Sequence, residues 1–154
     1  MSTSTTTTLA ELPSFKGKEL GTSDWFEITQ ERVNTFADAT DDHQWIHVDV
    51  ERAKAESPFR GPIGHGFLTL SLFVPMWSQI LTVTDVKMGV NYGLNKVRFP
   101  SAVRAGSQVR ARVTLLSAKE SPEFVDAVFL IYVESQSSPK PCCVAEWLVR
   151  YYPR

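Results

Sequence analysis

The stretch GFLTLSLFVPMWSQIL, residues 66–81, is the most apolar run of the chain. Large apolar side chains fall on nearly every side of the helix that it would form, and a helix without a polar face is usually buried. The run is too short to span a bilayer, which needs about 20 apolar residues. Pro75 is expected to kink it. The stretch therefore predicts a core helix covered by the rest of the fold.

Beyond residue 81 the hydrophobic period changes to two, which is typical of half-buried strands. Val109, Ala111 and Val113, for example, alternate with polar side chains, and Gly93 marks an expected bulge. Strands are predicted at 86–92, 94–99, 109–115, 124–133 and 143–152, with a turn cluster at 135–141. One buried helix followed by several antiparallel strands predicts an α+β domain.

Two short helices are predicted before the apolar run. Thr29 can cap a helix that runs through Asp38, and Asp49 can cap another that runs through Glu56. The segment between them, residues 40–48, is then expected to be a loop. Loops held between helices are common places for reactive side chains.

Length and composition favour one domain of 154 residues, large enough to bury a core. We expect residues 1–12 to form a disordered tail and residues 13–154 to form the domain. Residues 1–8 are a Ser/Thr tract without the charged and apolar regions of a secretory signal, so a cytoplasmic location is expected. A formal charge of −1 gives no support for binding nucleic acid or an anionic membrane.

The two cysteines, Cys142 and Cys143, are neighbours in the sequence. Adjacent residues of a strand point to opposite faces, so a disulfide between them would be strained. No pair of cysteines has the spacing of a metal or redox motif. We interpret both as small strand residues.

The predicted loop lies in FADATDDHQWIH, residues 36–47, where Asp42 and His47 are five positions apart. A carboxylate and an imidazole held near each other can position and deprotonate a water. The segment GPIGHG, residues 61–66, then opens the apolar helix, whose first N–H groups would stabilise negative charge. A zinc site built from His43 and His47, with Asp42 and His65, is the main alternative. We do not favour it, because no His-Glu-x-x-His pattern is present.

These segments resemble the MaoC-like family of R-specific enoyl-CoA hydratases. The family motif is matched by Phe36, Asp42, Ile46, His47 and Ala53, the helix start by His65-Gly66, and the central strand by residues 91–100 with Val103 and Gly106. The resemblance covers roughly residues 15–152. Two departures occur, since Asp41 replaces a glycine and Gln44-Trp45 replace Asn-Pro.

The resemblance implies a single hot-dog domain, an antiparallel sheet wrapped around its central helix, which pairs as a homodimer. It also implies hydration of a trans-2-enoyl-CoA, with water activated by Asp42 and His47 and the thioester oxygen held by the Gly66 N–H. The implied substrate contacts are Ile63, Gly64, His65, Gly66, Val90, Asn91, Tyr92, Gly93, Ser101, Ala102 and Val103. No metal and no separate cofactor are expected, because coenzyme A is part of the substrate. Arg98 and Arg104 are candidates to contact its phosphates.

Two other functions remain open from the sequence. A hot-dog thioesterase would place the water at the thioester carbon, and a non-catalytic protein would only bind acyl-CoA. Thioesterases of this fold generally use an acid on the central helix, and residues 67–81 contain none. This difference favours hydration.

Overall fold

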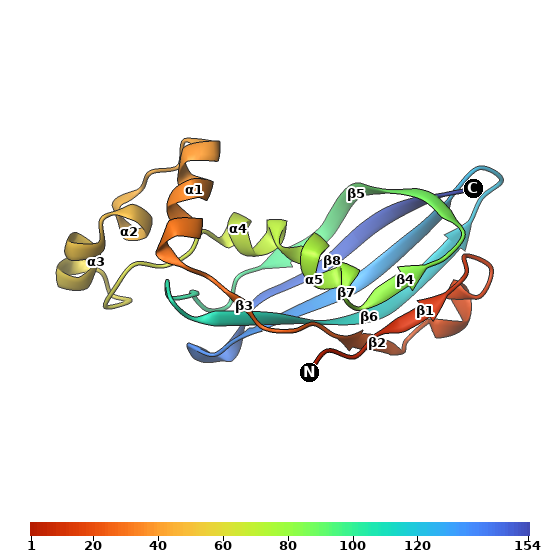
Figure 1. The fold of residues 1–154 in the computed structure, drawn as a ribbon, viewed down its shortest axis with the longest axis horizontal. Helices are drawn as coiled ribbons and strands as arrows, with labels where there is room; N and C mark the ends of the chain where they lie inside the picture. The colour runs from red at the N-terminus through yellow and green to blue at the C-terminus, as the bar shows by residue number, and fades with distance from the viewer.

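The computed structural model describes residues 1–154 and is built on a six-stranded antiparallel sheet (Figure 1). Its strands lie in the order β2-β6-β7-β8-β5, and β3 pairs with the end of β6. The strand bounds are β2 Glu19–Thr22, β3 Phe26–Glu27, β5 Val86–Arg98, β6 Gln108–Glu120, β7 Val125–Ser135 and β8 Ser138–Pro153. The predicted α+β architecture is confirmed.

The sheet deviates from the predicted strands at two places. The segments 86–92 and 94–99 form one strand, β5, whose register shifts between Asn91 and Gly93, as expected for a bulge. The turn expected at 135–141 is shorter, because Ser135 already pairs with Ser138 and β8 begins there. A tight turn lets β7 pair with β8 over almost the whole length of β7.

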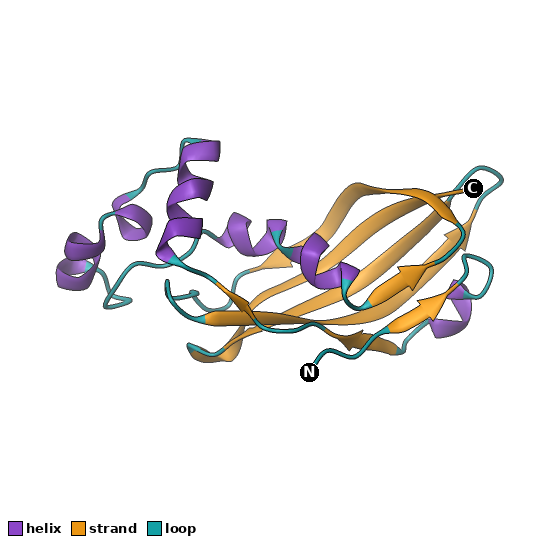
Figure 2. Ribbon diagram, in the orientation of Figure 1, coloured by secondary structure: helices purple, strands orange, loops and turns teal.

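The apolar run at 66–81 forms two helices that lie across one face of the sheet (Figure 2). They are α4, Gly66–Ser71, and α5, Phe73–Ser78, with the break at Leu72. Pro75 accounts for the break, because its ring clashes with the carbonyl four residues earlier and it lacks an N–H.

In the single chain this run is buried on the side that faces the sheet. Leu68, Phe73 and Met76 face the sheet and are buried, whereas Phe67 is 68% exposed and Val74 is 51% exposed. The sheet covers one side of a helix only, so the opposite side remains uncovered in the single chain. The exposed side is also apolar, which sets it apart from an ordinary solvated helix face.

The core lies between these helices and the concave face of the sheet. Every second residue of β7 is buried, as its alternating sequence predicts. Trp77 of α5 packs among Phe129, Trp147 and Tyr151, with ring centroids 5.7–6.1 Å from its own. Aromatic side chains thus fill the space where the helix crosses the strands.

Three helices project beyond one end of the sheet (Figure 1). They are α1, Gln30–Thr40, α2, Trp45–Val48, and α3, Val50–Glu56. The predicted caps are confirmed, since the side chains of Thr29 and Asp49 accept from Arg32 N–H and Arg52 N–H. The segment 40–48 is not entirely a loop, because its second half forms the single turn α2.

The expected disordered tail at residues 1–12 is instead part of the fold. Thr5–Thr7 form β1, which pairs in parallel with β4, Leu81–Val83. Leu9 and Leu12 are buried in the core, and Leu12 opens the 3-10 helix at Leu12–Phe15. Threonine is a strand-forming residue, and the two leucines anchor the segment. None of the helices is long and apolar enough to cross a membrane.

Candidate active site

The site begins where α1 ends. Asp41 closes the helix with φ 61°, a left-handed conformation that favours glycine and that aspartate tolerates better than most residues. The chain reverses there, and the exposed Asp42 follows. Its Oδ1 accepts a hydrogen bond from Gln44 N–H at 3.4 Å. The reversal aims Asp42 back toward the start of α4.

His47 lies on α2 and is only 7% exposed. Its Nδ1 is 2.7 Å from the carbonyl oxygen of Ile63 and must be the donor, because a carbonyl oxygen only accepts. Nε2 of the neutral ring therefore carries the free lone pair. Burial lowers the pKa of His47 below its ordinary value of 6.5, and the nearby His65 acts in the same direction. His47 is thus prepared to accept a proton at neutral pH.

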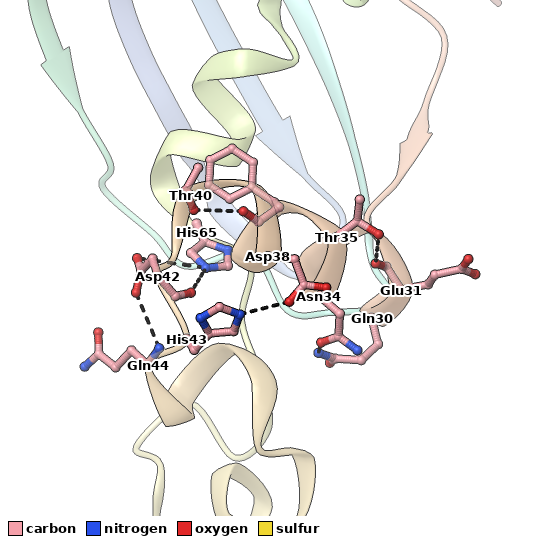
Figure 3. Close-up of polar contacts among 11 residues, drawn as sticks. Gln30, Glu31, Asn34, Thr35, Asp38, Thr40, Asp42, His43, Gln44 and His65 are labelled. Atoms are coloured by element: carbon pink, nitrogen blue, oxygen red, sulfur yellow. Dashed lines mark hydrogen bonds and ion pairs between the residues drawn. The ribbon is translucent and has the colours of Figure 1, made fainter.

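His65 is the N-cap residue of α4 and is 3% exposed. Figure 3 shows it pointing at Asp42, and its Nε2 donates to the Asp42 carbonyl oxygen at 3.0 Å. The ring stacks on His47 with 3.9 Å between centroids and lies 4.9 Å from the ring of Phe36. Its buried Nδ1 has no hydrogen-bond partner. His65 therefore joins the Asp42 loop to the ring of His47.

Asp42, His47 and His65 each direct one ligand-type atom into a common space, and these atoms lie within 4.8 Å of one another. One water can bridge groups at this separation. One nitrogen of each ring is already hydrogen-bonded to a carbonyl oxygen, His47 Nδ1 to Ile63 and His65 Nε2 to Asp42, so each ring has only one nitrogen left to offer a metal. His43, one of the two leading histidines of the zinc alternative, is engaged elsewhere, because its Nε2 pairs with Asp38 Oδ1 at 2.9 Å (Figure 3).

Gly66 is the first residue of α4, so its N–H has no acceptor within the helix. It faces a cavity of about 370 Å³ lined by His47, Phe59, Ile63, Gly64, Gly66, Thr69, Phe99, Pro100, Ser101, Ala102, Val103 and Cys142. The ring of Phe99 lies against Gly66, with three of its carbons 3.2 Å from where a Cβ would be. A larger hollow of about 500 Å³ follows α1 but contains neither His47 nor Gly66. The smaller cavity is the one lined by both His47 and Gly66.

Most of the predicted contacts, but not all, lie at this cavity. Ile63, Gly64, Gly66 and residues 101–103 line it. Asp42 and His65 are not among its lining residues, but each has a ligand-type atom within 4.8 Å of a ring nitrogen of His47. Residues 90–93 do not line it. They lie on β5, at the edge of the sheet, where the Asn91 amide oxygen accepts from the indole N–H of Trp147 at 2.9 Å. Their place beside the thioester stays a prediction, because in the single chain β5 pairs with β8 on one edge and its other edge is unpaired.

The comparisons with known proteins agree with this geometry. The MaoC-like domain family matches residues 12–128. The chain is 52% identical to 3-hydroxyacyl-thioester dehydratase Z of Mycobacterium tuberculosis, over 93% of this chain and 95% of that one. The chain belongs to the MaoC-like family.

Two further relatives support the assignment. Nodulation protein N of Rhizobium leguminosarum bv. viciae is 44% identical over 91% of this chain and 88% of that one. An unliganded R-hydratase from Pseudomonas aeruginosa superimposes with a TM-score of 0.75 at 20% identity, covering 96% of this chain and 86% of that one. The predicted hot-dog fold is confirmed, and the chain is an enzyme of the hydratase and dehydratase type.

Several residues of this MaoC-like site were missed from the sequence. Phe59, Phe99 and Cys142 line the cavity, yet their local patterns are those of a loop, a strand end and an interior strand position. Gln30 was missed as well, although its amide donates to the His47 carbonyl oxygen at 2.7 Å. Its position at the start of α1 carries no local signal of that contact, which joins residues far apart in the sequence.

Proposed function

We propose that this MaoC-like protein is an R-specific enoyl-CoA hydratase that adds water to a trans-2-enoyl-CoA to give an (R)-3-hydroxyacyl-CoA. The observation that carries the proposal is the proximity of Asp42 and His47, since a carboxylate oxygen of Asp42 lies within 4.8 Å of a ring nitrogen of His47. The R-hydratase among the structural relatives supports the fold needed for this reaction. The reverse reaction, loss of water from a 3-hydroxyacyl thioester, uses the same groups.

In the proposed reaction a water lies between the Asp42 carboxylate and Nε2 of His47. One of these groups removes a proton as the water oxygen bonds to the β-carbon of the enoyl group. The α-carbon then receives a proton from the pair, so the protons balance. The negative charge that gathers on the thioester oxygen is stabilised by the Gly66 N–H at the start of α4. Glycine leaves the approach to that N–H free of a side chain.

Absorbance of crotonyl-CoA gives the first test. Loss of the enoyl band without release of free thiol is the expected result, and chiral analysis of the product should give the R form. Thiol release would indicate the thioesterase alternative instead. Binding of crotonyl-CoA without any reaction would indicate a non-catalytic acyl-CoA-binding protein. The lack of any acid on α4 and α5 argues against the thioesterase.

We also propose that the protein acts as a homodimer. The strand β5 is at the edge of the sheet and has one row of unpaired backbone groups. Most of the exposed large apolar side chains, all but Met1 and Phe59, lie on or next to this strand and on the outer side of the central helices. They are Phe67, Val74, Met88, Val90, Tyr92, Leu94 and Phe99. An exposed apolar edge is unfavourable in a monomer, and a second copy would cover it.

A further inference from the structure

A second hollow, of about 330 Å³, lies beside the catalytic cavity. Three cationic side chains line it, those of Lys54 on α3, Arg60 in the loop that follows and Arg104 in the loop between β5 and β6. No acidic residue is among its lining residues. We refer to it as the cationic hollow.

Arg104 of the cationic hollow is held by a hydrogen bond, and neither arginine of the hollow is neutralised. Arg104 Nη2 donates to the carbonyl oxygen of Arg60 at 3.1 Å, and it lies over Gly61, where a Cβ would come within 3.3 Å of it. Neither Arg60 nor Arg104 forms an ion pair, and Lys54 has only a distant contact of 3.6 Å with the exposed Glu51. Guanidinium groups with free N–H donors are well suited to bind phosphate.

The backbone places the hollow next to the reactive groups. Ile63 and Arg104 form an antiparallel bridge, and directly opposite residues of such a pair share one face. Ile63 lines the catalytic cavity and its carbonyl oxygen holds His47. On the other side, Gln30 lines the cationic hollow and donates to the His47 carbonyl oxygen. A long substrate with its reactive end at His47 can therefore extend across this bridge.

We propose that the cationic hollow binds a phosphate group of the carrier to which the acyl thioester is attached. The inference rests on the proposed function for the thioester and adds the group that the enzyme recognises at the other end of the carrier. Both coenzyme A and a carrier protein attach the acyl chain through a pantetheine arm that ends in phosphate. Arg98, the other candidate from the sequence, lies outside the hollow, and its guanidinium donates to the neighbouring Val97 carbonyl oxygen at 2.8 Å.

The test compares two substrates that differ in phosphate, crotonyl-CoA and crotonyl-pantetheine. Lys54→Ala and Arg60→Ala should each raise KM for crotonyl-CoA about tenfold and leave kcat nearly unchanged, since the two side chains would contact the carrier phosphate and not the reacting atoms. KM for crotonyl-pantetheine should not change. Arg60→Ala retains the carbonyl oxygen that holds Arg104, so this contact is preserved.

Two controls separate phosphate binding from folding and from general charge. Arg104→Lys keeps a cation in the hollow and should retain most of the affinity that Arg104→Ala loses. Lys119→Ala removes an exposed cation near the other end of β6 and should change neither KM. An equal rise of KM for both substrates, or no rise for either, would overturn the proposal while turnover still supports the hydratase.

Calorimetry with free coenzyme A keeps the test independent of catalysis. If the wild-type protein hydrates neither substrate, the proposed function fails, yet weaker binding of coenzyme A by the Lys54→Ala/Arg60→Ala variant still supports the hollow. Equal binding of coenzyme A by the wild-type protein and the variant, or no binding by either, overturns the proposed role of the hollow.

A crotonyl thioester on a carrier protein shows which phosphate of the carrier the hollow binds. If the variants bind the thioesters of both carriers more weakly, the hollow binds the phosphate that the two pantetheine arms share. If they bind only the coenzyme A thioester more weakly, the hollow binds the nucleotide phosphates.

Discussion

The proposed role of His47 rests on two features of its surroundings. The Ile63 carbonyl oxygen fixes the proton on Nδ1, and burial disfavours the charged ring. The lowered pKa means that His47 stays neutral as the pH falls below 6.5, the ordinary value for a histidine. We therefore expect the acid limb of kcat/KM for crotonyl-CoA to lie below pH 6.5, as a pH–rate profile can measure.

Variants of the catalytic pair provide the companion measurement. Asp42→Asn and His47→Gln should each lower kcat by at least ~10², the usual loss for acid–base catalysis, with unchanged melting temperature. Asp41→Asn is the matched control, since Asp41 lies beside Asp42 and has its own role in closing α1. Equal damage from the Asp41 and Asp42 variants, or an acid limb above pH 6.5, would contradict the assignment.

His65 is expected to act on the reaction through its neighbours. His65→Phe keeps a ring beside His47 but leaves the Asp42 carbonyl oxygen without its donor, which costs about 1–3 kcal/mol. We expect kcat/KM to fall by roughly 10- to 100-fold, because 1.4 kcal/mol corresponds to a factor of ten. His65→Gln keeps an N–H donor and should recover part of the loss. His43→Gln replaces an exposed histidine of the same loop and should leave kcat/KM almost unchanged.

At the scale of elements, the start of α4 is the part of the fold on which the reaction depends most. Gly66→Ala places a methyl group between the helix start and the Phe99 ring, at 3.2 Å from its carbons. The backbone there is helical, so the variant should fold. If the Gly66 N–H binds the thioester oxygen, the crowding should lower kcat by ~10²–10³, the loss typical of an impaired oxyanion site.

A double variant tells crowding by Phe99 apart from crowding of the substrate. Phe99 is 40% exposed, so Phe99→Ala should be tolerated. Gly66→Ala/Phe99→Ala restores the space on that side of the glycine. If the double variant regains turnover, the loss came from displacement of Phe99. Full turnover by Gly66→Ala alone would remove the oxyanion role altogether.

At the scale of the whole molecule, the apolar side of α4 and α5 and the edge strand β5 form one uncovered region. We expect light scattering at micromolar concentration to give the mass of a dimer with twofold symmetry. Leu94→Lys puts a charge on β5 and should shift the protein toward monomer. Glu19→Lys changes an exposed charge on β2, at the other edge of the sheet, and should leave the dimer intact. A monomeric wild-type mass would refute the proposal.

The sequence by itself determined the local structure and the type of fold. The alternation in residues 109–115 and 124–133 predicts half-buried strands, and Thr29 and Asp49 predict helix starts that the structure confirms. The chemistry of Asp42 and His47 was also visible, since a carboxylate and an imidazole at that spacing match a known motif. These features depend on neighbours within a few residues, which a sequence displays directly.

Only the tertiary structure decided which groups meet. The pairing of β5 with β8 removes residues 90–93 from the cavity, and the sheet leaves one side of α4 and α5 uncovered. The stacking of His47 on His65, and the gathering of Lys54, Arg60 and Arg104, join residues from separate elements. Contacts of this kind are set by how the sheet and helices pack, and no local pattern of hydrophobicity or spacing encodes them.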